Sequence, residues 1–104
     1  MTRYRLSLEA ESDLDEIKRY LTEQSGVVIA RHVLREIRLA LRFLAATPGA
    51  GHKREDLTDE PVRFWSIFSY MIVYDPATRP LGVARVLQGS QNLEALFRKN
   101  PPRV

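Results

Sequence analysis

The chain has 104 residues, of which 44% are hydrophobic and 28% are charged, and it contains no cysteine. This length suits a single domain with one core, residues 1–104, and the composition argues against intrinsic disorder. The lack of cysteine excludes disulfides, thiolate catalysis and cysteine-based zinc sites. The sequence has no run of about 18 apolar residues, so it predicts no membrane-spanning helix. We therefore expect a soluble, cytoplasmic protein.

The net charge is +3, from 16 basic and 13 acidic residues, and most of the basic residues are arginine. Arginine favours the recognition of carboxylates and phosphates. The two signs are segregated, since residues 9–23 are mainly acidic whereas residues 25–54 are mainly basic. A modest net charge with this segregation fits an acidic protein partner as well as nucleic acid.

The first elements are a short strand and two helices. Residues 3–6 alternate in polarity and predict a strand, and Ser7 is placed to cap the helix that follows. Apolar residues recur along one helical stripe over residues 10–21, and Gly26 ends that helix. A second apolar stripe, followed by Thr47-Pro48-Gly49, predicts a helix over residues 27–46. The two helices should form an antiparallel hairpin.

The predicted second helix has an unusual surface. Four of its arginines fall within about 60° of each other on a helical wheel, and we name them the arginine ridge. The ridge consists of Arg31, Arg35, Arg38 and Arg42. Further apolar residues, including Leu39 and Phe43, widen the apolar arc to more than half of the circumference. Packing on one helix and one sheet face does not require so wide an arc, so we expect another chain to cover part of it.

The second half of the chain carries the sheet. Residues 63–75 and 83–87 are rich in aromatic and β-branched side chains and predict a three-stranded antiparallel meander. Neither face is cleanly polar, so we expect the helices on one face and a partly wetted apolar surface on the other. Residues 93–98 predict a short helix capped by Asn92, and residues 100–104 are expected to fray.

These elements predict an α+β fold: an N-terminal strand, an antiparallel helical hairpin, a three-stranded antiparallel meander that completes a small sheet, and a short C-terminal helical tail. This order resembles the ParE/RelE superfamily of bacterial type II toxin–antitoxin (plasmid stabilisation) systems, and in particular its ParE branch. The residues that carry the resemblance are Tyr4-Arg5-Leu6-Ser7, Ala10, Asp13-Leu14, Ile17, Tyr20, Ala30, Leu44, Pro48, Gly51, Arg63, Trp65, Tyr70, Ile72, Tyr74 and Arg85-Val86-Leu87.

The resemblance implies a small toxin in a hetero-oligomer with a ParD-like antitoxin, whose acidic C-terminal segment wraps around it. ParE-type toxins inhibit DNA gyrase by binding, which implies no direct contact with DNA. Two alternatives stay open: a RelE-like ribosome-dependent mRNA endoribonuclease, and a degenerate member that binds antitoxin without being toxic.

A metal-free ribonuclease needs a base, an acid and cations, and the alternative candidates here are His52, Arg63 and Arg85. Many relatives carry histidine, arginine and aspartate after the last strand, where this chain has Gln88, Gln91 and Asn92. These three side chains do not transfer protons. With two histidines and no cysteine, we expect no metal ion, no cofactor and no catalytic residue.

Two binding surfaces are predicted instead. The antitoxin surface comprises Arg31, Arg35, Arg38, Leu39, Arg42 and Phe43. The target surface comprises Trp65, Arg85, Gln88, Gln91 and Asn92. Each has an ordinary structural alternative, because an arginine in a strand often pairs with a nearby acid, an aromatic residue in a strand is often core, and a row of arginines is often a solvated helix face.

Overall fold

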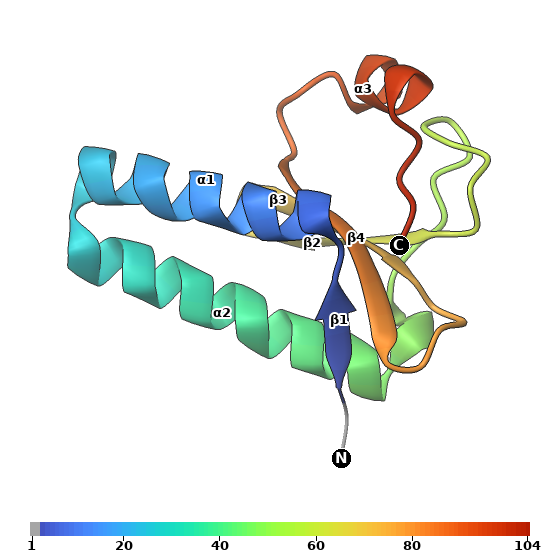
Figure 1. The fold of residues 1–104 in the computed structure, drawn as a ribbon, viewed down its shortest axis with the longest axis horizontal. Helices are drawn as coiled ribbons and strands as arrows, with labels where there is room; N and C mark the ends of the chain where they lie inside the picture. The colour runs from blue at the N-terminus through green and yellow to red at the C-terminus, as the bar shows by residue number, and fades with distance from the viewer. Residues whose placement is uncertain (1–2) are drawn as a thin grey trace.

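A computed structural model describes residues 3–104 and confirms the predicted α+β fold (Figure 1). The helical elements are α1 (Leu8–Ser25), α2 (Val27–Ala46), the 3₁₀ turn η1 (Pro48–Ala50) and α3 (Leu93–Lys99). The strands are β1 (Tyr4–Leu6), β2 (Arg63–Ile67), β3 (Tyr70–Asp75) and β4 (Leu81–Gln88).

The helical hairpin forms as its sequence signals predict. The hydroxyl of Ser7 accepts a hydrogen bond from the backbone N–H of Ala10 and so caps α1. Gly26 separates the helices with a φ of +90°, a left-handed value that favours glycine. Helix α2 has the predicted bounds, residues 27–46.

The sheet has the strand order β1-β4-β3-β2, with β2 and β1 at its edges. Strands β2, β3 and β4 form the predicted antiparallel meander, and β1 pairs parallel to β4 with Tyr4 opposite Leu81. The register shifts where Val73 pairs with Arg85 and Tyr74 with Val83, so Ala84 is the extra residue of a β-bulge. The α1–α2 hairpin is therefore part of the long connection between the two parallel strands.

The main core lies between the helical hairpin and one face of the sheet. Both predicted helical stripes face it, and Ile37, Leu41 and Leu44 of α2 are fully buried. Tyr74 is fully buried as well, although it carries a hydroxyl. That hydroxyl donates to the Pro48 carbonyl at 2.6 Å and accepts from the Gly51 N–H at 2.9 Å, which ties the end of α2 to the sheet.

The second face of the sheet is covered, so the prediction of a partly wetted surface was wrong. Phe64, Val73 and Leu87 form a second apolar cluster with Leu93 and Phe97 of α3. The Phe64 and Phe97 rings lie 5.9 Å apart between centroids. Figure 1 shows α3 and the loop that precedes β2 on the same side of the molecule. The short terminal helix α3 therefore covers apolar side chains on this face of the sheet.

The C-terminal segment is also ordered against the sheet, and the expectation that residues 100–104 fray was wrong. Pro102 is buried, and Arg103 pairs with Glu60 at 3.1 Å. Val104 packs over Gly82, where an added Cβ would come within 2.7 Å of the Val104 Cβ. Glycine at position 82 therefore makes room for the end of the chain.

Candidate functional site

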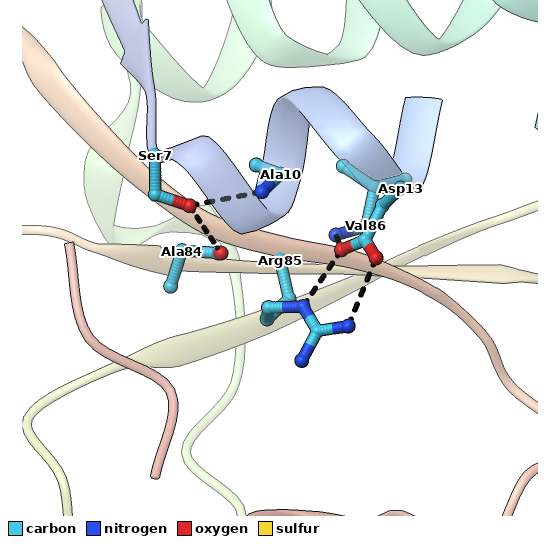
Figure 2. Close-up of polar contacts among 6 residues, drawn as sticks. All are labelled: Ser7, Ala10, Asp13, Ala84, Arg85 and Val86. Atoms are coloured by element: carbon cyan, nitrogen blue, oxygen red, sulfur yellow. Dashed lines mark hydrogen bonds and ion pairs between the residues drawn. The ribbon is translucent and has the colours of Figure 1, made fainter. Parts of the chain in front are cut away.

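Strand β1 spans three residues, so β4 has no strand neighbour on that edge beyond Val83. The start of α1 supplies the missing polar partners, as Figure 2 shows. The Ser7 hydroxyl donates to the Ala84 carbonyl at 2.7 Å, and an Asp13 carboxylate oxygen accepts from the Val86 N–H at 3.0 Å. These bonds continue the pattern of a sheet edge with side chains in place of a strand.

Asp13 also forms a two-point ion pair with Arg85. The Arg85 Nε and Nη2 atoms donate to the two Asp13 oxygens at 2.8 and 2.9 Å, and the Asp13 and Arg85 side chains are only 13% and 18% exposed. This hydrogen bonding to Asp13 raises the pKa of Arg85 despite the opposing effect of burial. We name Ser7, Asp13 and Arg85 the clasp, because they join α1 to β4.

A groove of about 280 Å³ lies beside the clasp. The residues that line it include Asp13, Tyr20, Tyr70, Arg85, Gln88 and Gln91. Its lining charges are two carboxylates and one guanidinium, and each carboxylate is paired with an arginine, Asp13 with Arg85 and Glu16 with Arg19. Burial, and then the neighbouring Tyr20, raises the pKa of Tyr70, which keeps this phenol protonated at neutral pH. The groove therefore offers hydrogen-bond donors and acceptors, among them the Tyr70 hydroxyl and the Gln88 and Gln91 amides.

The structure divides the predicted target surface. Arg85, Gln88 and Gln91 line the groove together. Asn92 caps α3, because its side-chain oxygen accepts from the Ala95 N–H at 3.1 Å. Trp65 lies instead on the helix side of the sheet, half-buried, with its ring centroid 5.4 Å from that of Phe43. Trp65 thus joins the predicted antitoxin surface.

The arginine ridge is solvent-exposed along its whole length. Within residues 3–104, none of its four guanidinium groups forms an ion pair with a carboxylate. Leu39 and Phe43 on the same helix are 49% and 46% exposed, as expected of an apolar arc wider than the intramolecular packing requires. Basic and apolar side chains therefore lie side by side on the outside of α2, available to a partner.

The alternative catalytic residues do not form one site. His52 is exposed, and its backbone N–H and carbonyl pair with Phe64. The Arg63 guanidinium donates to the Gly51 carbonyl at 2.9 Å. Arg85 lies two strands away on β4, held by Asp13. The ordinary alternative for a strand arginine, pairing with a nearby acid, holds for Arg85.

Two further properties concern residues 3–104 alone. This part of the chain contains no cluster of three or more histidine, cysteine, aspartate or glutamate side chains arranged to hold a metal ion. It also contains no helix that is both long and apolar enough to cross a membrane.

Two residues that shape these surfaces were missed in the sequence analysis as site residues. In the sequence, Asp13 is an acidic residue near the N-terminal end of a predicted helix. The helix dipole favours negative charge there, so the position of Asp13 needed no tertiary contact to explain it. Phe68 lies in the two-residue turn between β2 and β3, where Asn-Gly or Gly-containing pairs are usual. The signal in the sequence is an aromatic residue at a turn position where glycine or asparagine is usual.

Comparisons with known proteins agree with this geometry. Residues 4–93 match the family described as the ParE toxin of the type II toxin–antitoxin system parDE. Toxin ParE1 of Caulobacter vibrioides is 34% identical over 95 residues, which cover 91% of this chain and 97% of the relative. Toxin ParE3 of the same organism is 31% identical over 87 residues, which cover 84% and 86%. A solved structure described as the chromosomal ParDE TA system from P. aeruginosa shares the fold, with a TM-score of 0.71, coverage of 85% and 96%, and 20% identity.

Proposed function

Because the chain belongs to the ParE toxin family of type II toxin–antitoxin systems, we propose that it inhibits DNA gyrase by binding and that a ParD-like antitoxin neutralises it. The family implies gyrase as the target. The observation that supports binding rather than cleavage is the chemistry of the groove, where Gln88 and Gln91 are uncharged and Arg85 is already paired with Asp13. Such a groove recognises a protein surface through hydrogen bonds.

The toxin acts in the cytoplasm as one domain and needs no cofactor. Its partner is an antitoxin with an acidic C-terminal segment, which lies along the exposed outside of α2. The arginine ridge attracts the carboxylates, while Leu39 and Phe43 receive apolar side chains of the same segment. Trp65, next to Phe43, extends this antitoxin surface onto the sheet.

Expression of the wild-type chain without antitoxin tests the target. Gyrase inhibition damages DNA, so we expect growth arrest with induction of the SOS response and inhibition of DNA supercoiling by the purified protein. The matched variant His52→Gln should be as toxic as the wild type, because binding requires no proton transfer from this exposed histidine. Translational arrest, or a loss of toxicity of about a hundredfold in His52→Gln with its fold intact, would instead identify a ribonuclease.

Salt dependence tests the antitoxin surface. The double variant Arg35→Gln/Arg38→Gln keeps helix propensity and should associate with the antitoxin several-fold more slowly at low salt. The difference should shrink at high salt, because the Debye length falls to roughly 3 Å at 1 M. The control is Arg19→Gln/Arg98→Gln, which removes the same charge from exposed sites on α1 and α3. Equal association rates for the two double variants would refute the assignment of the ridge.

A further inference from the structure

The turn between β2 and β3 holds a phenylalanine in an unfavourable backbone conformation. Phe68 and Ser69 connect the strands, whose last pair is Ile67 opposite Tyr70. Phe68 has a φ of +53°, and within residues 3–104 it is the only non-glycine residue with a positive φ. A bulky side chain in the left-handed region is a genuine outlier, since asparagine and glycine occupy it at far lower cost.

Burial of the ring does not explain this conformation, because the Phe68 side chain is 58% exposed. Its ring has one aromatic neighbour, His32 on α2, with centroids 6.3 Å apart and the planes at 55°. The turn is nevertheless held from behind, because the Gly89 N–H donates to the Ser69 carbonyl at 2.8 Å. The fold thus presents an aromatic ring to solvent in a defined place.

We propose that Phe68 is a target-binding anchor, which inserts into an apolar pocket on the protein that this toxin poisons. The inference rests on the proposed function. Strained backbone persists where the surrounding structure enforces it, and it is concentrated at binding sites. An exposed aromatic ring held in place loses little conformational entropy on binding, which is the property of a residue that dominates an interface.

The position of Phe68 favours the target over the antitoxin. The turn adjoins the end of β4, where Gln88 pairs with Tyr70, so Phe68 lies at the same end of the sheet as the groove. The apolar part of the antitoxin surface lies further along α2, where Phe43 contacts Trp65. In Figure 1 the hairpin of α1 and α2 runs along the sheet and extends past this end.

The surroundings of Phe68 define the chemistry of the pocket. His32 is the aromatic neighbour of the ring, and the Phe68 side chain is otherwise largely open to solvent. An exposed phenylalanine ring fits an apolar pocket. The partner surface is therefore an apolar pocket on the target protein.

The substitution Phe68→Asn separates binding from folding, because asparagine tolerates the left-handed conformation. If the ring serves only the fold, the variant will be less stable than the wild type. If the ring is an anchor, the variant will melt at the same or a higher temperature, while its affinity for purified gyrase and its toxicity fall by about tenfold or more. The control is Leu8→Asn, which makes the change to asparagine at another exposed apolar residue. Leu8 is 81% exposed and is the first residue of α1.

The outcomes are distinguishable. A stable, non-toxic Phe68→Asn that still co-purifies with the antitoxin supports the anchor. Wild-type toxicity in this variant, a lower melting temperature, or a loss of antitoxin binding with full toxicity overturns it. If the wild type itself neither arrests growth nor inhibits gyrase, the proposed function fails first and the anchor falls with it.

Discussion

Replacing Asp13 with asparagine is the sharpest perturbation of the clasp. The carboxylate of Asp13 accepts three hydrogen bonds, two from Arg85 and one from the Val86 N–H. The amide oxygen of asparagine still accepts from Val86, but the amide N–H₂ group is a donor and does not pair with a guanidinium. Arg85 would keep its charge at 18% side-chain exposure and lose its counter-ion.

The size of this effect follows from burial. Removing one partner of a buried ion pair costs roughly 3–5 kcal/mol, because the remaining charge is left without compensation. The pair retains a little solvent contact, so we expect a loss of about 3 kcal/mol from a total stability of roughly 5–15 kcal/mol. For a domain of this length the corresponding fall in Tm is roughly 12–24 °C.

A double-mutant cycle in urea measures the interaction directly. The variants are Asp13→Asn, Arg85→Gln and the two combined, and we expect the combination to lose about 2 kcal/mol less than the sum of the single losses. The control is Glu16→Gln, which breaks an ion pair with Arg19 whose side chains are 66% and 67% exposed. That control should change stability by less than about 0.5 kcal/mol.

Strict additivity in the cycle would refute this account of the clasp. So would a coupling energy that disappears in 1 M NaCl, because salt screens an exposed pair far more than a buried one. In either case Arg85 would be free to contact a partner directly, and its assignment as a structural residue would have to be withdrawn.

Three further predictions concern the core and the chain end. Gly51→Ala should lose roughly 1–3 kcal/mol in urea unfolding, because the new Cβ would lie 2.5 Å from the Tyr74 hydroxyl, whereas Gly49→Ala meets open space and should be nearly neutral. Burial raises the pKa of Tyr74, so at high pH the folded state retains a proton that the unfolded state releases. The contribution of Tyr74 to stability should therefore be fully present below pH about 10 and should fall as the pH rises further. Tyr74→Phe should reduce that fall in urea midpoints measured across pH about 9–11. Deleting residues 100–104 removes the buried Pro102 and uncovers Gly82, so it should expose apolar surface and increase binding of a hydrophobic dye, whereas an unchanged dye signal and Tm would show that the segment only rests on the surface.

The sequence predicted the elements whose signals are local. Helix α2 shows its full apolar stripe and a clear stop, so both of its ends agree with residues 27–46. The caps formed by Ser7 and Asn92 follow from side chains that satisfy nearby N–H groups, and both were confirmed. These features depend on residues within one or two turns of each other, which a linear pattern records.

The features that were not predicted depend on residues far apart in the chain. Asp13 contacts Arg85 across 72 positions, and an acid in the N-terminal half of a helix gives no sign of such a partner. Residues 100–104 were expected to fray as the end of the chain, whereas Pro102 is buried and Val104 covers Gly82. A position near a terminus carries no information about which residues an extended segment packs against.

The predicted binding surfaces show the same difference between local patterns and contacts that depend on the whole fold. The wheel placed Leu39 and Phe43 on one exposed arc, and the structure confirms their exposure. It could not show that Trp65 would lie against Phe43 rather than beside Arg85, because that depends on the order of strands in the sheet. Strand order is a property of the whole chain.

The pairing of β1 with β4 has a consequence for synthesis of the toxin on the ribosome. Tyr4 emerges first, yet its partner Leu81 follows 77 positions later, and Gly82 in turn receives Val104 at the end of the chain. A nascent chain that lacks β4 can form the helical hairpin, whose contacts are local, but it can form neither the clasp nor the groove. The order of the strands therefore delays assembly of the groove until the last quarter of the chain has been made. A partner that recognises only α2 can bind earlier, before the clasp and the groove have formed.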